Sequence, residues 1–203
     1  MSKEAVDYFK KGAIVIFPTD TVYGIGCCLS NKAAIKRLYK LRRTPFSKPT
    51  LILAADSKQA SKYGYFDKDT RQFVERFWPG PVTVIVKAKP LIPKIIQGGA
   101  GTIAIRVPNQ PALLKIIEKI GEPILAPSAN FHNQPTPASF AKIDRKLLSL
   151  VDYSIDLANL GDFLPMLKKP STVVDLTKIP YQMIRVGTLS EDKIKNTLGG
   201  SRK

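Results

Sequence analysis

Polar side chains follow the apolar runs of this chain at the points where predicted strands end. The run 13–17 is continuous and β-branched, as in a strand buried on both faces. Pro18 should stop its pairing, and Thr19, Asp20 and Thr21 then crowd two hydroxyls and a carboxylate into one turn. Ligands of open α/β sheets bind just beyond strand ends, although an ordinary turn with nothing bound has the same composition.

The ends of the later predicted elements carry similar groups. These are Arg42, Arg43, Lys48, Thr102, Arg106, Ser128, Asn130, Ser171, Asp175 and Arg185. Hydroxyl, amide and guanidinium groups suit the binding of carboxylates and polyanions. His132 is the only histidine, so the sequence has no nucleophile–histidine pair and no metal-ligand cluster, and we expect His132 to be a loop surface residue.

Two further sequence features argue against other kinds of site. Cys27 and Cys28 are adjacent and should face opposite sides of a strand, which disfavours a mutual disulfide. No Walker loop follows a predicted strand, so any ATP site lies outside the P-loop plan. The glycine-rich stretch 98–101 is a weak phosphate-loop signal that is more typical of a connection.

Short apolar strands alternate with amphipathic helices along the chain. Strands are expected near 13–17, 50–54, 82–86, 102–106, 123–127, 153–156, 172–176 and 181–185, and helices near 2–11, 32–41, 57–63, 68–77, 110–120, 138–148 and from 190. The late strands leave no room for crossover helices, which favours some antiparallel pairs. We therefore predict an α/β fold, a single domain over residues 1–203 with one twisted mixed sheet and flanking helices.

Net charge is the most unusual bulk property of the 203 residues. Lysine and arginine number 32 against 16 acidic residues, which gives +16. Such an excess attracts nucleotides, phosphates and RNA, but scattered lysines on solvated faces give the same count. No apolar run approaches the roughly 18–20 residues of a membrane span, and the N-terminus lacks a signal-peptide core. We expect a cytoplasmic protein without membrane association.

A set of short motifs occurs in an order that is typical of one family. The motifs are Pro18-Thr-Asp-Thr-Val-Tyr-Gly24, Lys48-Pro49, Trp78-Pro-Gly-Pro81, Thr102-Ile-Ala-Ile-Arg106-Val-Pro108, Pro127-Ser-Ala-Asn130, Ser171-Thr-Val-Val-Asp175 and Arg185-Val-Gly187. Together they resemble the YrdC-like threonylcarbamoyl-AMP synthases over about residues 12–187. The first motif and Ser-Ala-Asn are the most specific.

The resemblance implies an activity and a fold. In that family L-threonine, bicarbonate and ATP give threonylcarbamoyl-AMP and pyrophosphate, and a partner enzyme system uses the product to modify an adenosine of tRNA. The family fold is an α/β domain with a twisted sheet and a basic concave face. The chemistry needs positioning and charge neutralisation more than a protein acid or base, so no catalytic residue and no protein metal ligand are implied. A Mg²⁺ ion is expected on the ATP phosphates.

The resemblance also implies roles for individual positions. Thr21, Arg106 and Ser171 would bind threonine, with Arg106 on its carboxylate. The ATP-binding set would be Arg42, Lys48, Thr102, Ser128, Asn130, Thr136 and Arg185.

One loop departs from the family pattern. The family usually has Lys-x-Arg before the proline that follows the second helix, and here Arg42 and Thr44 occupy those positions. A cation is lost at Thr44, so either Arg43 or Lys48 turns inward or the enzyme is slow. Two alternatives to a synthase follow: an RNA-binding module of the same fold without this activity, and an enzyme that hydrolyses or transfers a carbamoylated nucleotide.

Overall fold

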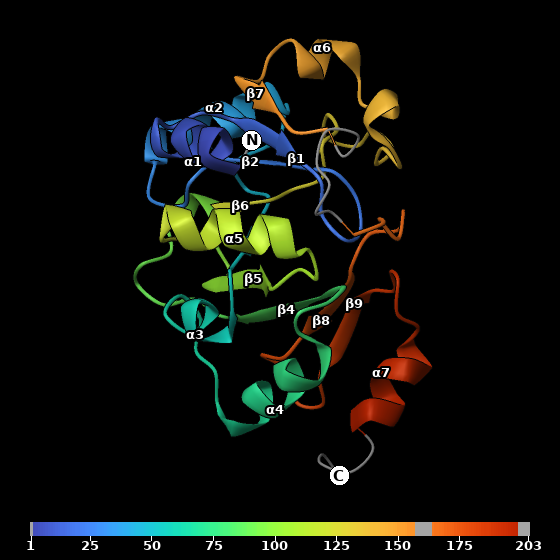
Figure 1. Ribbon diagram of the computed structural model, residues 1–203. Helices are drawn as coiled ribbons and strands as arrows, with labels where there is room; N and C mark the ends of the chain where they lie inside the picture. The colour runs from blue at the N-terminus through green and yellow to red at the C-terminus, as the bar shows by residue number, and fades with distance from the viewer. Residues whose placement is uncertain (1, 157–163, 199–203) are drawn as a thin grey trace.

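The strands assemble into two mixed sheets (Figure 1), and the larger of two buried hydrophobic clusters draws residues from both. The computed structural model describes residues 2–156 and 164–198. The strands are β1 (Val15–Phe17), β2 (Gly24–Gly26), β3 (Leu51–Leu53), β4 (Val82–Lys87), β5 (Thr102–Arg106), β6 (Ile124–Leu125), β7 (Tyr153–Ser154), β8 (Thr172–Asp175) and β9 (Gln182–Arg185).

Helices cover the faces and ends of these sheets (Figure 1). The α-helices are α1 (Ser2–Lys10), α2 (Lys32–Leu41), α3 (Ser57–Ala60), α4 (Lys68–Phe77), α5 (Pro111–Ile120), α6 (Arg145–Leu148) and α7 (Glu191–Leu198), and the 3-10 helices are η1 (Lys94–Ile96) and η2 (Phe140–Lys142). The prediction of a mixed α/β fold is confirmed. Asn31 caps α2 because its side chain accepts from the backbone N–H of Ala34.

The strand orders are β2-β1-β7 in the small sheet and β6-β3-β5-β4-β8-β9 in the large one. Both sheets contain parallel and antiparallel pairs, and β8 with β9 is an antiparallel pair as predicted. The expected single sheet is therefore two sheets, linked by bridges from Gly24 to Ser128 and from Cys28 to Ile124. Gly26 permits this close approach, because a Cβ there would collide with the carbonyl of Leu125.

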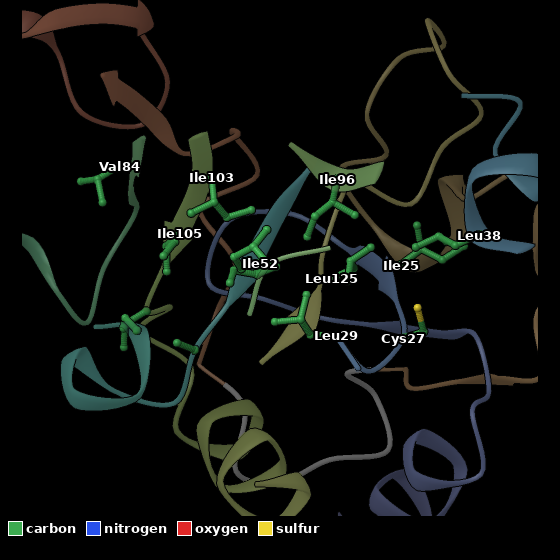
Figure 2. Close-up of a cluster of buried hydrophobic side chains, with 14 of the residues drawn as sticks. Ile25, Cys27, Leu29, Leu38, Ile52, Val84, Ile96, Ile103, Ile105 and Leu125 are labelled. Atoms are coloured by element: carbon green, nitrogen blue, oxygen red, sulfur yellow. The ribbon is translucent and has the colours of Figure 1, made fainter. Parts of the chain in front are cut away.

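The core runs from one sheet to the other. Figure 2 shows Ile25 of β2 and Leu125 of β6 in the same cluster as Ile52 of β3 and Ile105 of β5. Cys27 belongs to this cluster, whereas Cys28 packs in a second cluster beneath α1 and α5, so the two thiols face different cores as predicted. Both cysteines are free, and burial raises the pKa of each thiol to about 12.

Two local predictions were wrong. The segment 138–148 is not one helix, because Asp144 breaks it and caps α6 by accepting from the N–H groups of Lys146 and Leu147. Strand β2 is not among the expected strands, since its sequence Gly-Ile-Gly has low strand propensity. Its pairing with β1 and its contacts with the β6 segment override that propensity.

Candidate functional site

The strand register brings three polar side chains together where neighbouring strands of the large sheet begin or end. Strand β4 is antiparallel to β5 and parallel to β8, so the end of β5 lies beside the starts of β4 and β8. Strand β9 runs back along β8 with Arg185 opposite Val173. Arg106, Ser171 and Arg185 therefore meet, although they are far apart in sequence.

Arg106 is the best-anchored of these groups. Its side chain is buried, with Nε donating to the carbonyl of Gly80 at 2.9 Å and Nη1 donating to Thr21 Oγ1 at 2.7 Å. Its Nη2 donates to Asp20 Oδ1 in a buried ion pair. Burial lowers the pKa of Arg106, and Asp20 opposes that shift. Three of the five guanidinium N–H groups are thus held, which leaves two for a ligand.

Ser171 makes hydrogen-bond contacts with both strand β4, the neighbour of the Arg106 strand, and Arg185. The hydroxyls of Ser171 and Thr83 lie 2.8 Å apart, and Arg185 donates from Nε and Nη2 to the Ser171 carbonyl at 3.1 and 2.9 Å. Burial, and then the charge of Arg106, lower the pKa of Arg185. Two guanidinium groups therefore lie close enough to repel, which favours an anion between or beside them.

The turn after β1 sets the direction of the hydrogen bonds that Thr21 makes. The Thr19 hydroxyl donates to the Val22 carbonyl at 2.7 Å, so in its 3.0 Å contact with Thr21 Oγ1 the proton must come from Thr21. Thr21 Oγ1 also accepts from Arg106. Its own proton is then used, and its remaining capacity is to accept one hydrogen bond from a ligand donor.

These side chains line a small cavity of about 60 Å³, which we call the inner cavity. Its polar lining consists of Thr19, Thr21, Arg106, Ser128, Thr136, Ser171 and Arg185. All three predicted threonine-binding residues, Thr21, Arg106 and Ser171, lie here. The arrangement offers positive charge and hydroxyl groups, which suits a small carboxylate that also carries hydrogen-bond donors.

A second cavity of about 250 Å³, the outer cavity, lies beside the first and shares Leu51, Ser128 and Arg185 with it. Its other polar lining residues are Tyr39, Arg42, Thr44, Lys48, Thr50 and His132. Four residues of the predicted ATP-binding set line it: Arg42, Lys48, Ser128 and Arg185. Three of these four are cations, so the outer cavity suits a polyanion.

Arg42 is a buried cation paired only with neutral groups in the described part of the chain. Its Nε donates to the Asn130 carbonyl at 3.1 Å and its Nη1 to Thr44 Oγ1 at 3.2 Å, and the residue is 8% exposed. Burial lowers its pKa to about 10. A guanidinium kept in this environment without a carboxylate indicates a site for an anionic ligand.

The side chain of Arg43 points away from both cavities. Its backbone has φ of 57° and its guanidinium lies over the ring of Phe131, 4.9 Å from the centroid. It lines neither cavity, whereas Lys48 lines the outer one. Of the two cations that were expected to compensate for Thr44, the structure places Lys48 at the cavity and Arg43 on an aromatic face.

The Ser-Ala-Asn segment forms the wall between the cavities. Ser128 Oγ donates to Asn130 Oδ1, and Asn130 Nδ2 donates to the carbonyls of Phe131 and Gln134. Asn130 therefore lines neither cavity and holds Ser128 and the following loop in place. His132 is a half-exposed loop residue, as expected, and it also lines the outer cavity; its backbone N–H donates to the Arg42 carbonyl at 2.8 Å.

Besides Asn130, two predicted ATP-binding residues lie away from the outer cavity. Thr136 lines the inner cavity instead. Thr102 begins β5, at the opposite end from Arg106, and lines neither cavity. Leu51 pairs with Ala104, so continuing this register places Thr102 level with Pro49 at the rim of the outer cavity.

Comparison with known proteins decides the family. A model of the Sua5/YciO/YrdC family, described as telomere recombination, matches residues 7–187. The chain belongs to this family.

Several family members cover nearly all of the chain. The threonylcarbamoyl-AMP synthase of Pyrococcus abyssi is 32% identical over 199 residues, which are 98% of this chain and 57% of that protein. The crystal structure of P. abyssi Sua5 with L-threonine has a TM-score of 0.90 and 31% identity, covering 99% of this chain and 58% of that one. This Sua5/YciO/YrdC protein thus spans little more than half the length of that relative.

Two other relatives are closer to it in length. A putative threonylcarbamoyl-AMP synthase of Methanocaldococcus jannaschii is 33% identical over 198 residues, 95% of this chain and 90% of that protein. The crystal structure of Escherichia coli YciO has a TM-score of 0.82 and 29% identity, covering 95% of this chain and 91% of that one. The family resemblance read from the motifs is confirmed.

The sequence analysis assigned no ligand-binding role to several residues of this Sua5/YciO/YrdC site. The inner cavity is also lined by Thr19, and the outer one by Tyr39 and Thr44. Two of these unassigned groups hold arginines: Thr44 accepts from Arg42, and Asp20 accepts from Arg106. The motif around Thr19 and Asp20 was a usable signal, whereas nothing in the spacing indicates Tyr39. Among the described residues, there is no group of three or more His, Cys, Asp or Glu side chains for a metal, and no helix has the length and apolar character needed to cross a bilayer.

Proposed function

We propose that the protein is a threonylcarbamoyl-AMP synthase that condenses L-threonine, bicarbonate and ATP. The observation that carries the proposal is the pair of adjoining cavities, one small with two guanidinium groups and one larger with three cations. An amino acid in the inner cavity and the phosphates of ATP in the outer cavity would meet at Ser128 and Arg185. The synthase names of the relatives from P. abyssi and M. jannaschii support this assignment.

The chemistry needs alignment more than proton transfer by the protein. The neutral threonine amine adds to the carbon of bicarbonate, and loss of water leaves a carbamate. A carbamate oxygen then attacks the α-phosphorus of ATP, the bond to the β-phosphate oxygen breaks, and pyrophosphate leaves. Arg106 would hold the carboxylate, while Arg42, Lys48 and Arg185 would neutralise charge that develops on the phosphates.

A Mg²⁺ ion would come with the nucleotide rather than sit in a protein site. The outer cavity is lined by hydroxyls and cations, and its described lining includes no carboxylate. Magnesium bound this way keeps phosphate oxygens and water as ligands. We therefore assign no magnesium-binding residue and propose that the ion shields charge on the ATP phosphates.

Formation of the product tests the proposed function directly. Radiolabelled L-threonine, incubated with the protein, ATP, bicarbonate and magnesium, should enter an adenylate that separates from free threonine by chromatography. The label should stay on free threonine when bicarbonate is removed. Conversion of a supplied carbamoyl-adenylate without any synthesis from threonine would instead support hydrolysis or transfer, the alternative reaction on this fold.

We expect Thr21→Val to weaken threonine binding about tenfold, roughly 1–2 kcal/mol, because the change removes the acceptor and strands a buried N–H of Arg106. Thr21→Ser keeps the hydroxyl and should bind nearly as the native protein does. Isothermal titration calorimetry of both variants makes the comparison. A loss in Thr21→Ser with none in Thr21→Val would mean that the methyl group, not the hydroxyl, contributes the affinity.

The product is a reactive mixed anhydride, so a partner enzyme must consume it close to its source. We propose that this partner modifies tRNA, in keeping with the family, and that both act in the cytoplasm. The proposal rests on the family and on the synthase reaction.

RNA binding without this chemistry is the second candidate, and the net charge of +16 favours it. A basic concave face stays a prediction. We expect RNA affinity to fall by roughly 0.7–0.9 log units per tenfold increase in salt for each phosphate neutralised, and ATP to compete for a shared face. Filter binding of a short RNA across a salt series measures both. Binding that neither salt nor ATP reduces would indicate a separate RNA site.

A further inference from the structure

Asp20 is a buried carboxylate that the proposed reaction does not use. It follows β1, is 4% exposed, and its Oδ1 accepts from Arg106 Nη2. Its Oδ2 is also buried and has no hydrogen-bond partner among the described residues. Leaving a buried acceptor unsatisfied costs free energy, and such groups are rare in native structures. This cost suggests that the second oxygen is kept for a purpose beyond pairing Arg106.

The charges around the inner cavity do not cancel. Arg106 and Arg185 are both cations that line it, and burial, followed by the Arg106 charge, lowers the pKa of Arg185. Within the described residues, Asp20 is the one acid that contacts either guanidinium. The three groups carry a net charge of +1, which would become +2 without Asp20.

We propose that Asp20 is a specificity-determining and positioning residue, which makes the inner cavity favour a carboxylate that carries its own ammonium group. The inference rests on the proposed binding of threonine. A fixed negative charge beside Arg106 weakens the attraction for any carboxylate, and it stabilises an ammonium on the same ligand. Both effects are larger in buried surroundings than in water. The charge of Asp20 thus disfavours a carboxylate ligand that lacks an ammonium group, in addition to any direct contacts that the site makes with the amine.

The test compares L-threonine with 3-hydroxybutyrate, the same molecule without the ammonium group. Calorimetry on the native protein and on Asp20→Asn gives a preference, the ratio of the two affinities, for each protein. We expect the preference for threonine to fall at least tenfold in Asp20→Asn. A role in folding alone would weaken both ligands by the same factor, and an unchanged preference would overturn the proposal.

Asp152→Asn is the matched control. Asp152 also pairs with an arginine, Arg37, at 2.7 Å. Arg106, the partner of Asp20, lines the inner cavity, whereas Arg37 lines neither cavity, so the loss of Asp152 should leave the preference unchanged. A similar fall in this variant would overturn the assignment to Asp20.

A second variant covers the case in which Asp20→Asn does not fold, since that change leaves Arg106 buried without a counter-charge. Asp20→Glu keeps the charge, so it should keep the preference even if both affinities drop. Loss of the preference in folded Asp20→Glu would overturn the proposal. Absence of threonine binding by the native protein would overturn the proposed function itself, whereas native binding with an unchanged preference in the variants removes only the role of Asp20.

Discussion

Replacing Arg106 with alanine should nearly abolish threonine binding. The guanidinium is held by Gly80, Thr21 and Asp20, so its two remaining N–H groups are fixed in direction before a ligand arrives. Loss of a buried, charge-assisted contact of this kind costs roughly 2–5 kcal/mol, which is at least thirtyfold in affinity. Calorimetric titration with L-threonine measures the effect.

Stability must be measured with the same Arg106→Ala protein. The change leaves Asp20 buried and unpaired, which costs roughly 3–5 kcal/mol of folding free energy. Thermal unfolding followed by circular dichroism shows whether the variant is folded at the titration temperature. Arg106→Lys keeps a positive charge opposite Asp20 but loses the planar guanidinium with its several N–H donors. It should therefore be more stable than Arg106→Ala and still bind threonine poorly.

Arg37→Ala is the control for this experiment. Arg37 makes an exposed pair with Asp152 and lines neither cavity, so threonine affinity should not change. Unchanged threonine affinity in folded Arg106→Ala would remove Arg106 from the amino-acid site.

The second large effect concerns two adjacent arginines that should behave differently. Arg42→Ala should weaken ATP binding by about 2–3 kcal/mol, because it removes a buried cation of the outer cavity that no described carboxylate neutralises. Arg43→Ala should change ATP affinity little, since that side chain lies over Phe131. Threonine affinity should be preserved in both variants, because neither residue lines the inner cavity.

Restoring the family pattern separates the remaining explanations for this loop. The double variant Arg42→Lys with Thr44→Arg adds a cation to the outer cavity, so we expect ATP turnover to rise. A large loss on Arg43→Ala, with no gain in the double variant, would mean that Arg43 has taken over in solution. If neither change affects nucleotide binding or turnover, the phosphates do not lie in the outer cavity.

The sequence predicted the fold where local pattern and tertiary context agree. The helix after Asn31 has a capping side chain, an apolar stripe and basic exposed positions, and α2 begins at Lys32 as expected. The prediction of one helix over 138–148 was wrong because the apolar spacing there suggests a helix while Asp144 offers a competing cap. Strand β2 depends on partners distant in sequence, which no local pattern contains.

The site was predicted less completely than the fold because side-chain direction is a tertiary property. The motif order placed Thr21, Arg106 and Ser171 together, and the structure puts all three on the inner cavity. The same motifs left open whether Arg43 or Lys48 turns inward; the structure shows that Arg43 has a positive φ and lies over Phe131. The ion pair of Asp20 with Arg106 joins residues 86 positions apart, so it too required the structure.

Pyrophosphate release is the most direct test of the central claim that one protein joins threonine, bicarbonate and ATP. Purified protein would be assayed with magnesium and ATP in bicarbonate-depleted buffer, with threonine and bicarbonate added separately and then together. The proposed arrangement of cavities predicts pyrophosphate only when both are present, and a strong loss in Arg106→Ala. Pyrophosphate that appears without threonine, or no turnover under any of these conditions, would contradict the assignment as a synthase.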